Sequence, residues 1–317
     1  MVKMSKTSSK LSYQFQFFFF LLLSQFFFTL SENTKQNLLY ISKIPTKSSF
    51  FVILDKGIFI YDTNLINNTT ILEFSKKQRS PKENTDIFFT QEKEYYTWFM
   101  NDLLYIYNPR DKKVNYHILN TEPDSEHFNI KINDKNLIMY LIKRNKGTTS
   151  IMKRYYFIKD LPDKIIFQKE KGIFVINETL SKNDINCLVN KNNNLLQCLY
   201  YNNGGIIEVN INEDNNKIKK NILNNLSNNK KINKIKSAFG NNNKYLFCAL
   251  FEDYSSKCFY KNNNDKINEI KCSIQKDCED IKVYYFEENN EFVFVCPKEK
   301  EIVLSVVKNI NKISEIS

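Results

Sequence analysis

The sequence has 317 residues and a formal net charge of +11, and Phe and Tyr, with 26 and 18 residues, far outnumber Gly and Pro, with 6 each. This length allows one large all-β domain or two ordinary domains, and the aromatic supply suits a β-sheet core. The lysines are scattered among Asn and Glu without a basic helix or patch, which argues against a nucleic-acid-binding protein. We interpret them as a solvated surface, with binding of anionic lipid or sulfated glycan as the alternative.

Residues 1–31 have the pattern of a secretory signal peptide. Three lysines precede the apolar run Phe17–Leu30, and Thr29 and Ser31 are small residues before Glu32. The run is shorter than the roughly 20 apolar residues of a spanning helix. We therefore expect cleavage before Glu32 and a secreted or surface-displayed chain, with an uncleaved anchor as the alternative. No later run approaches this length, so we expect no membrane span in the mature chain.

Six stretches after the leader read as pairs of short apolar strands joined by turn residues. They are Ser49–Asp62, Thr97–Asn108, Leu137–Phe157, Leu195–Asn210, Tyr245–Tyr260 and Phe292–Val307.

These stretches recur every 40 to 58 residues, which is the spacing of β-meander blades. The sequence therefore predicts an all-β, β-propeller-like domain of about six blades of antiparallel meanders over residues 32–307. Tandem β-sandwiches also produce short strands at regular intervals and are the alternative. Residues 308–317 follow as a tail. Truncation of a longer protein at this tail is the alternative to a natural end.

Two segments between the hairpins have a different composition. Asn215–Lys236 places Ile and Leu at loosely helical spacing but is rich in Asn and Lys, so we expect either a helix or a long mobile loop. Lys76–Asp86 reads as an exposed loop.

The cysteines all lie in the second part of the chain, and in an oxidising compartment disulfides are the default interpretation. They are Cys187, Cys198, Cys248, Cys258, Cys272, Cys278 and Cys296. The first two flank a turn signal between apolar runs, and so do the next two, which places each pair across one hairpin. Bridges that close such short loops contribute roughly 2–4 kcal/mol each.

The remaining cysteines leave the pairing open. Cys278 and Cys296 bracket a hairpin centred on Glu288–Asn290, and Cys272 is then left over or takes the place of Cys278. A zinc site is the sharper alternative, but the sequence has no CxxC pair. We expect no bound metal.

Catalytic motifs are not found in the sequence. His117 reads as part of a strand and His127 as a loop edge, and neither lies in a motif. No GxSxG, HExxH, P-loop or GxGxxG occurs. Asn212–Asn215 lacks the Gly and the terminal Glu of an EF-hand. The acidic pairs Glu279–Asp280 and Glu287–Glu288 fall in predicted turns. We therefore expect no cofactor and no enzymatic activity.

Four asparagines begin N-x-[ST] sequons and are candidate glycosylation sites: Asn67, Asn68, Asn177 and Asn225. All but Asn177 fall in predicted loops.

An aromatic cluster is the other local feature. It consists of Tyr95, Tyr96, Trp98 and Phe99. We expect it to lie in the core, with an exposed sugar-stacking or adhesive patch as the alternative.

The segment Cys278–Cys296 resembles parts of secreted, cysteine-bearing proteins from AT-rich parasite genomes, and the Phe-rich leader and Asn/Lys-rich loops are similar in style to malaria-parasite surface proteins. Six β units with internal disulfides are also similar in layout to the cysteine-rich protective antigen of that genus. The resemblance implies a secreted six-bladed propeller without enzymatic activity. The chain departs from it because its first three units contain no cysteine.

We expect a non-enzymatic protein-binding or adhesion module that presents loops on a rigid β scaffold to a protein partner at a cell surface. One alternative is the ectodomain of a longer membrane receptor. Another is a secreted propeller hydrolase, which would need acids such as Asp55, Asp102 and Asp253 within about 5–10 Å of one another.

Overall fold

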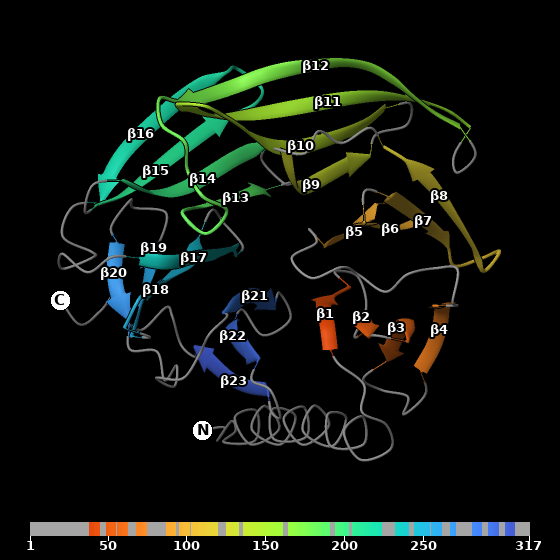
Figure 1. The fold of residues 1–317 in the computed structure, drawn as a ribbon. Helices are drawn as coiled ribbons and strands as arrows, with labels where there is room; N and C mark the ends of the chain where they lie inside the picture. Colours follow the sequence, from red (N-terminus) through yellow and green to blue (C-terminus); the bar gives the residue numbers. More distant parts are fainter. Residues whose placement is uncertain are drawn as a thin grey trace, which may run out of the picture. The chain divides into compact units, whose positions relative to one another are not determined.

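The structure is a computed structural model. It describes residues 38–44, 49–54, 56–62, 68–74, 87–92, 95–101, 103–119, 125–132, 136–160, 164–190, 194–202, 205–223, 232–240, 244–253, 255–261, 267–270, 281–286, 291–297 and 302–307 (Figure 1). The predicted signal peptide of residues 1–31, the tail 308–317 and the predicted loop Lys76–Asp86 lie outside these ranges.

The chain divides into two compact units, unit 1 ending at Asn120 and unit 2 beginning at Thr121. Every regular element within the described ranges is a strand. No helix in this part of the chain is long and apolar enough to cross a bilayer.

Unit 1 contains two four-stranded antiparallel sheets. The first consists of β1 (Leu38–Lys43), β2 (Ser49–Leu54), β3 (Gly57–Asp62) and β4 (Asn68–Glu73). The second consists of β5 (Phe88–Glu92), β6 (Tyr95–Met100), β7 (Leu103–Asn108) and β8 (Lys113–Ile118).

Unit 2 contains three four-stranded sheets and one sheet with three described strands. The C sheet consists of β9 (Ser125–Ile132), β10 (Asn136–Asn145), β11 (Thr148–Asp160) and β12 (Lys164–Ile176). The D sheet consists of β13 (Ile185–Asn190), β14 (Leu195–Asn202), β15 (Gly205–Asn212) and β16 (Lys217–Leu223). The E sheet consists of β17 (Ile232–Phe239), β18 (Tyr245–Phe251), β19 (Ser256–Lys261) and β20 (Ile267–Ile270). The F sheet consists of β21 (Lys282–Phe286), β22 (Glu291–Pro297) and β23 (Ile302–Val307).

The strands of every sheet lie side by side in chain order. This meander arrangement follows from short turns between antiparallel neighbours. β-Sandwiches of the Greek-key type would instead bring strands that are not consecutive in the chain next to each other. The alternative of tandem sandwiches is therefore wrong, and the expectation of about six meander units is confirmed.

All six predicted hairpins are confirmed, and each supplies the second and third strands of one sheet. They are β2–β3, β6–β7, β10–β11, β14–β15, β18–β19 and β22–β23. These inner pairs carry the clearest apolar runs because strands covered on both faces need apolar side chains on both faces.

Glycine is required at two of the hairpins. Gly147 follows Lys146 in the two-residue turn between β10 and β11, and its φ of 81° is a left-handed conformation that favours glycine. Gly57 begins β3, where a Cβ atom would lie 2.4 Å from the carbonyl oxygen of Leu72. A side chain at this position would force β3 and β4 apart.

The aromatic cluster predicted from the sequence lies in the core of unit 1. Trp98 is fully buried, and its ring stacks on Tyr105 with centroids 5.1 Å apart and an interplanar angle of 2°. Phe51 of the first sheet lies 5.3 Å from the Trp98 ring. Tyr96 and Phe99 are buried as well, and Tyr95 is half-buried. The prediction of a core cluster is therefore confirmed for Tyr96, Trp98 and Phe99, and these three do not form an exposed patch.

Unit 2 is built around a row of first strands. β9 lies beside β13, β13 beside β17, and β17 beside β21. The successive sheets extend away from this row, so that the first strand β13 is largely buried whereas the fourth strands β12 and β16 are largely exposed. Apolar side chains of neighbouring sheets share common core clusters, as Leu199 of β14 and Phe247 of β18 do.

Two sequence-based expectations are wrong. Asn215–Lys236 is neither a helix nor one long loop, because it contains β16 and the start of β17. Its lysine-rich part Lys217–Leu223 forms a mostly exposed fourth strand. His127 is not at a loop edge but lies buried within β9. His117 lies in β8, as expected.

Candidate functional site

A carboxylate in the middle of β15 is the most distinctive polar feature of the described chain. Glu208 lies between Ile207 and Val209, and its exposed fraction is 0%. Because side chains alternate along a strand, these two apolar neighbours pack toward the C sheet. Glu208 shares the opposite face with Ile206, which packs against the E sheet. The carboxylate is therefore held at the contact between the D and E sheets.

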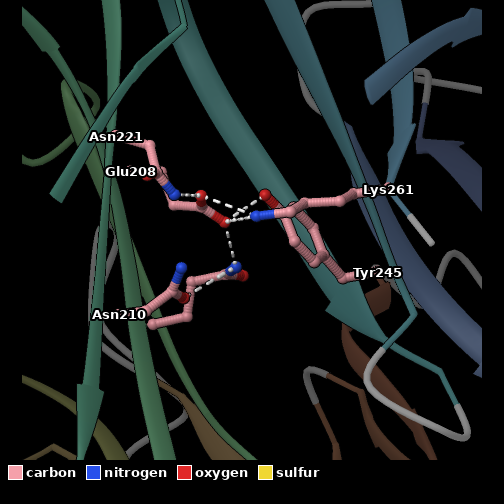
Figure 2. Close-up of polar contacts among 6 residues, drawn as sticks. Glu208, Asn210, Asn221, Tyr245 and Lys261 are labelled. Atoms are coloured by element: carbon pink, nitrogen blue, oxygen red, sulfur yellow. Dashed lines mark hydrogen bonds and ion pairs between the residues drawn. The ribbon is translucent and has the colours of Figure 1, made fainter. Parts of the chain in front are cut away.

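The E sheet supplies the charged partner. The Nζ atom of Lys261, which ends β19, lies 3.1 Å from Oε1 and 2.9 Å from Oε2 of Glu208. The hydroxyl of Tyr245, which begins β18, donates a hydrogen bond to Oε1. Tyr245 and Lys261 are direct partners in the β18–β19 register, so one cross-strand pair presents both groups to the carboxylate (Figure 2).

The D sheet supplies two amide donors. Asn221 Nδ2 of β16 donates to Glu208 Oε2 at 2.6 Å, and Gln197 Nε2 of β14 donates to Oε1 at 3.0 Å. Gln197 Nε2 also lies 3.3 Å from Asn210 Oδ1. We call these residues (Glu208, Lys261, Tyr245, Asn221, Gln197 and Asn210) the Glu208 cluster.

The cluster keeps the carboxylate ionised. Burial raises the pKa of Glu208, but the hydrogen bonds from Lys261, Tyr245 and Asn221 outweigh burial and hold the pKa below its ordinary value of 4.5. The Lys261 ammonium also lies 5.5 Å from the centroid of the Tyr245 ring, a favourable cation–π distance. The buried positive and negative charges therefore compensate each other.

A second polar contact joins the C and D sheets. Lys153 Nζ of β11 lies 2.6 Å from Glu213 Oε1, and the Tyr140 hydroxyl of β10 donates to Glu213 Oε2 at 2.9 Å. Glu213 belongs to the turn between β15 and β16. Together with the Glu208 cluster, this contact links three consecutive sheets through carboxylates of the D sheet.

The contacts of the Glu208 cluster indicate a structural role. Both carboxylate oxygens accept from several donors, which makes them weak bases, and the group is closed off from solvent. General-base catalysis requires a carboxylate that can reach a substrate proton. The cluster instead fixes the D sheet against the E sheet.

The two hairpin disulfides are present. Cys187 of β13 is bonded to Cys198 of β14, and Cys248 of β18 to Cys258 of β19, each with 4.1 Å between the Cα atoms. Both pairs are opposite each other in the strand register and are buried. Cys296 lies in β22, whereas Cys272 and Cys278 lie outside the described residues.

The acids of the hydrolase alternative do not form a described site. Asp253 is exposed in the turn between β18 and β19, where its carboxylate accepts from the backbone N–H of Ser255. Asp55 and Asp102 lie outside the described residues, as do Glu279–Asp280 and Glu287–Glu288. Within the ranges that the structure describes, no group of three or more His, Cys, Asp or Glu residues is arranged to hold a metal ion.

The candidate glycosylation sites fall in different environments. Asn177 is exposed directly after β12, and Thr179 of its sequon donates to the carbonyl of Asn145. Asn68 begins β4 and so is not in a loop. Asn67 and Asn225 lie outside the described residues.

No protein-family model and no curated protein matches the sequence. Among solved structures, the chain is similar to a mutant of AofleA from Arthrobotrys oligospora, with a TM-score of 0.53, 9% identity and coverage of 86% of each chain. The fold is β-propeller-like. The chain also aligns with the SapL1 lectin in complex with alpha methyl fucoside (TM-score 0.49, 11% identity, 84% of this chain and 96% of that chain) and with the WD40 domain of SCAP from fission yeast (TM-score 0.45, 12% identity, 86% and 84%). At these identities the likeness concerns the propeller-like fold alone.

Replacing Tyr245 with phenylalanine tests the hydroxyl of the Glu208 cluster. The change keeps the ring and removes one donor to a buried carboxylate, so we expect the free energy of unfolding to fall by about 1.5–3 kcal/mol. Urea denaturation followed by circular dichroism measures the difference. Tyr116→Phe is the matched control, because Tyr116 is 59% exposed. Equal stability of the two variants would contradict the structural role of the Tyr245 hydroxyl.

Proposed function

We propose that this chain is an exported, non-enzymatic scaffold that binds another protein at a cell surface. The observation that carries the proposal is the way in which unit 2 is held together. Two buried disulfides and the buried Glu208 cluster fix the strands and sheets against one another. Recognition by loops on a rigid frame suits this construction.

Export is supported by two independent features. The disulfides require an oxidising compartment to form and persist, and the first 31 residues have the composition of a cleavable leader. Sequons such as that of Asn177 are compatible with passage through a glycosylating pathway. The resemblance in layout to the cysteine-rich protective antigen, and an origin in an AT-rich genome, stay predictions from the residues.

Peptide mapping of the protein secreted from a eukaryotic host tests the export half of the proposal. Under non-reducing conditions we expect one peptide pair joined through Cys187 and Cys198, another through Cys248 and Cys258, and an N-terminus at Glu32. The control is the same chain, starting at Glu32 and produced in a reducing cytosol. In this sample the four cysteines should be free thiols that react with an alkylating reagent. Free thiols and an intact leader in the secreted sample would contradict export.

The binding half needs a separate measurement. The secreted protein, immobilised in its oxidised form, is expected to retain a specific protein from detergent-free preparations of intact cell surfaces. The same protein, reduced and alkylated, is the control, because loss of the disulfides loosens the frame without changing the sequence. Turnover of glycans or glycosides by the oxidised protein would instead favour the hydrolase alternative.

A further inference from the structure

The strand β16 has an open hydrogen-bonding edge. Among the described strands it pairs with β15 alone, and this pairing runs over all 7 residues of β16 without a shift of register. Figure 1 shows β16 as the outermost strand of the D sheet. In an antiparallel sheet every second residue of an edge strand directs its backbone N–H and C=O groups away from the neighbouring strand. β16 therefore presents a regular row of backbone donors and acceptors to a further strand.

The other described fourth strands have less suitable edges. The register of β4 shifts at one place and that of β12 at three, and β20 has only 4 residues. Irregular or short edges resist the addition of a strand. β8 is regular, but it contains one lysine and no acid. β16 is the fourth strand that combines a regular edge with a concentration of charge.

The side chains of β16 alternate between two faces of the D sheet. The face that carries Glu208 and its donor Asn221 also carries Lys217 and Lys219. The opposite face carries Ile218, Lys220 and Ile222. The two isoleucines are 46% and 61% exposed. A strand placed beside β16 would therefore meet lysines on one face and mainly apolar side chains on the other.

The charge of β16 has one sign. The strand contains three lysines and no acid. Directly opposite Lys217 and Lys220 on β15 lie Asn212 and Val209, so β15 places no carboxylate across from these two lysines. The acid of β15, Glu208, is buried within its own cluster. Since opposite charges on neighbouring strands stabilise a sheet, an acidic strand is the complement of this edge.

We propose that β16 adds an acidic, extended segment of the protein partner as a fifth, antiparallel strand of the D sheet. This inference rests on the proposed function and names the kind of segment that is bound. Backbone hydrogen bonds supply the affinity. Carboxylates opposite Lys217 and Lys219 on one face, and apolar side chains opposite Ile218 and Ile222 on the other, set the register.

A second copy of the chain fits the same edge less well. Antiparallel pairing of two β16 strands along their full length places Lys220 opposite Lys220. Like charges directly opposite each other destabilise a sheet. The lysines therefore oppose self-association at this edge while they favour an acidic strand.

A synthetic peptide tests the strand addition before the partner is known. The sequence TVTEEVE, capped at both ends, places glutamates opposite the three lysines and valines opposite the two exposed isoleucines in the antiparallel register. We expect a dye-labelled form to bind the oxidised protein in fluorescence anisotropy and to be released by salt. No binding of this peptide would overturn the proposal.

Two modified peptides test the backbone contact. Each carries N-methyl groups on one of the two alternate sets of amides. Because only one set of N–H groups faces a neighbouring antiparallel strand, one form should bind at least about tenfold more weakly. The other form should bind within a few-fold of the parent peptide. Equal binding by the two forms would overturn the proposal, since the peptide would then not be held as a strand.

Charge inversion on β16 tests the side chains. The combined variant Lys217→Glu, Lys219→Glu and Lys220→Glu should bind the peptide at least about tenfold more weakly than the wild type. The double variant Ile218→Thr and Ile222→Thr should also bind more weakly. Circular dichroism and thermal unfolding show whether both variants are folded.

The matched control inverts the same charge elsewhere. Lys56, Lys146 and Lys182 are exposed in turns, and replacing all three with Glu should leave peptide binding within a few-fold of wild type. Equal binding by the β16 charge variant and this control would overturn the proposal. So would a wild-type dimer in light scattering that the β16 isoleucine variant abolishes, because a second copy would then occupy the edge.

The same variants separate this inference from the proposed function. If the immobilised wild type retains a cell-surface protein and the β16 charge variant retains it equally well, strand addition at β16 is wrong and the proposed function stands. If the wild type retains no protein, the proposed function is wrong, and the peptide measurements alone decide whether β16 accepts an acidic strand.

Discussion

Replacing Lys261 with methionine should lower the free energy of unfolding by about 3–5 kcal/mol. The methionine keeps the length of the side chain but leaves Glu208, which is fully buried, without a cation. Breaking a buried ion pair on one side costs this much because the remaining charge is uncompensated. Urea denaturation at pH 7, analysed for both midpoint and slope, gives the difference.

Two further variants separate the ion pair from general effects of the substitution. Lys146→Met changes an exposed turn lysine and should cost less than about 0.5 kcal/mol. Adding Glu208→Gln to Lys261→Met removes the orphaned charge and should restore much of the lost stability. If Lys261→Met costs no more than the turn variant, the buried pair does not contribute as the structure indicates.

The pH dependence of the same variants has a definite sign. In the wild type the folded pKa of Glu208 is below its ordinary value of 4.5, so the stabilisation is fully present above pH 4.5 and is lost as the pH falls through the folded pKa. In Lys261→Met the buried carboxyl group loses its main counter-charge, and burial then raises its pKa. The stability gap between the two proteins should therefore narrow on acidification from pH 7 to pH 3.

Removing the disulfide between Cys248 and Cys258 is expected to cost about 2–5 kcal/mol. The double variant Cys248→Ala and Cys258→Ala frees a loop with a sequence separation of 10 and takes two sulfur atoms out of the packed core between the E and F sheets. Thermal unfolding without reductant should show a lower midpoint than the wild type.

The control for this variant is the wild type in excess reductant. Compared in the same excess reductant, which opens both disulfides, the wild type and the double variant should unfold at similar temperatures, because neither then has a cross-link. The corresponding change at Cys187 and Cys198, with a separation of 11, should have an effect of similar size. A midpoint unchanged from that of the oxidised wild type would mean that the cross-link adds nothing to packing and hydrogen bonds already present.

The hairpins could be predicted from the sequence because each is local. Ser49–Asp62 contains two apolar runs and the glycine that the turn requires, and Cys187 and Cys198 flank their own turn. Nothing from a distant part of the chain is needed for either interpretation. The fourth strands were harder to identify, since β16 faces solvent and has the composition of a loop.

The Glu208 cluster could not be predicted because its residues are far apart in the sequence, unlike those of a hairpin. Glu208 and Lys261 are 53 residues apart, and neither belongs to a spacing motif. One signal was present: Glu208 is a single acid within the apolar run Ile206–Val209 of a predicted inner strand. An acid in a strand covered on both faces must find a partner, but the sequence does not identify Lys261 as that partner.

The hairpin disulfides also limit the length to which the chain can be extended when force is applied to its two ends. Each bond joins neighbouring strands across one turn, so the chain between the two cysteines cannot be drawn out. At about 3.5 Å per extended residue, each loop withholds on the order of 35–40 Å from the contour length. Single-molecule stretching should therefore give a shorter fully extended chain in oxidising buffer than in reductant. The missing length should come from unit 2, where the cysteines of both described disulfides lie.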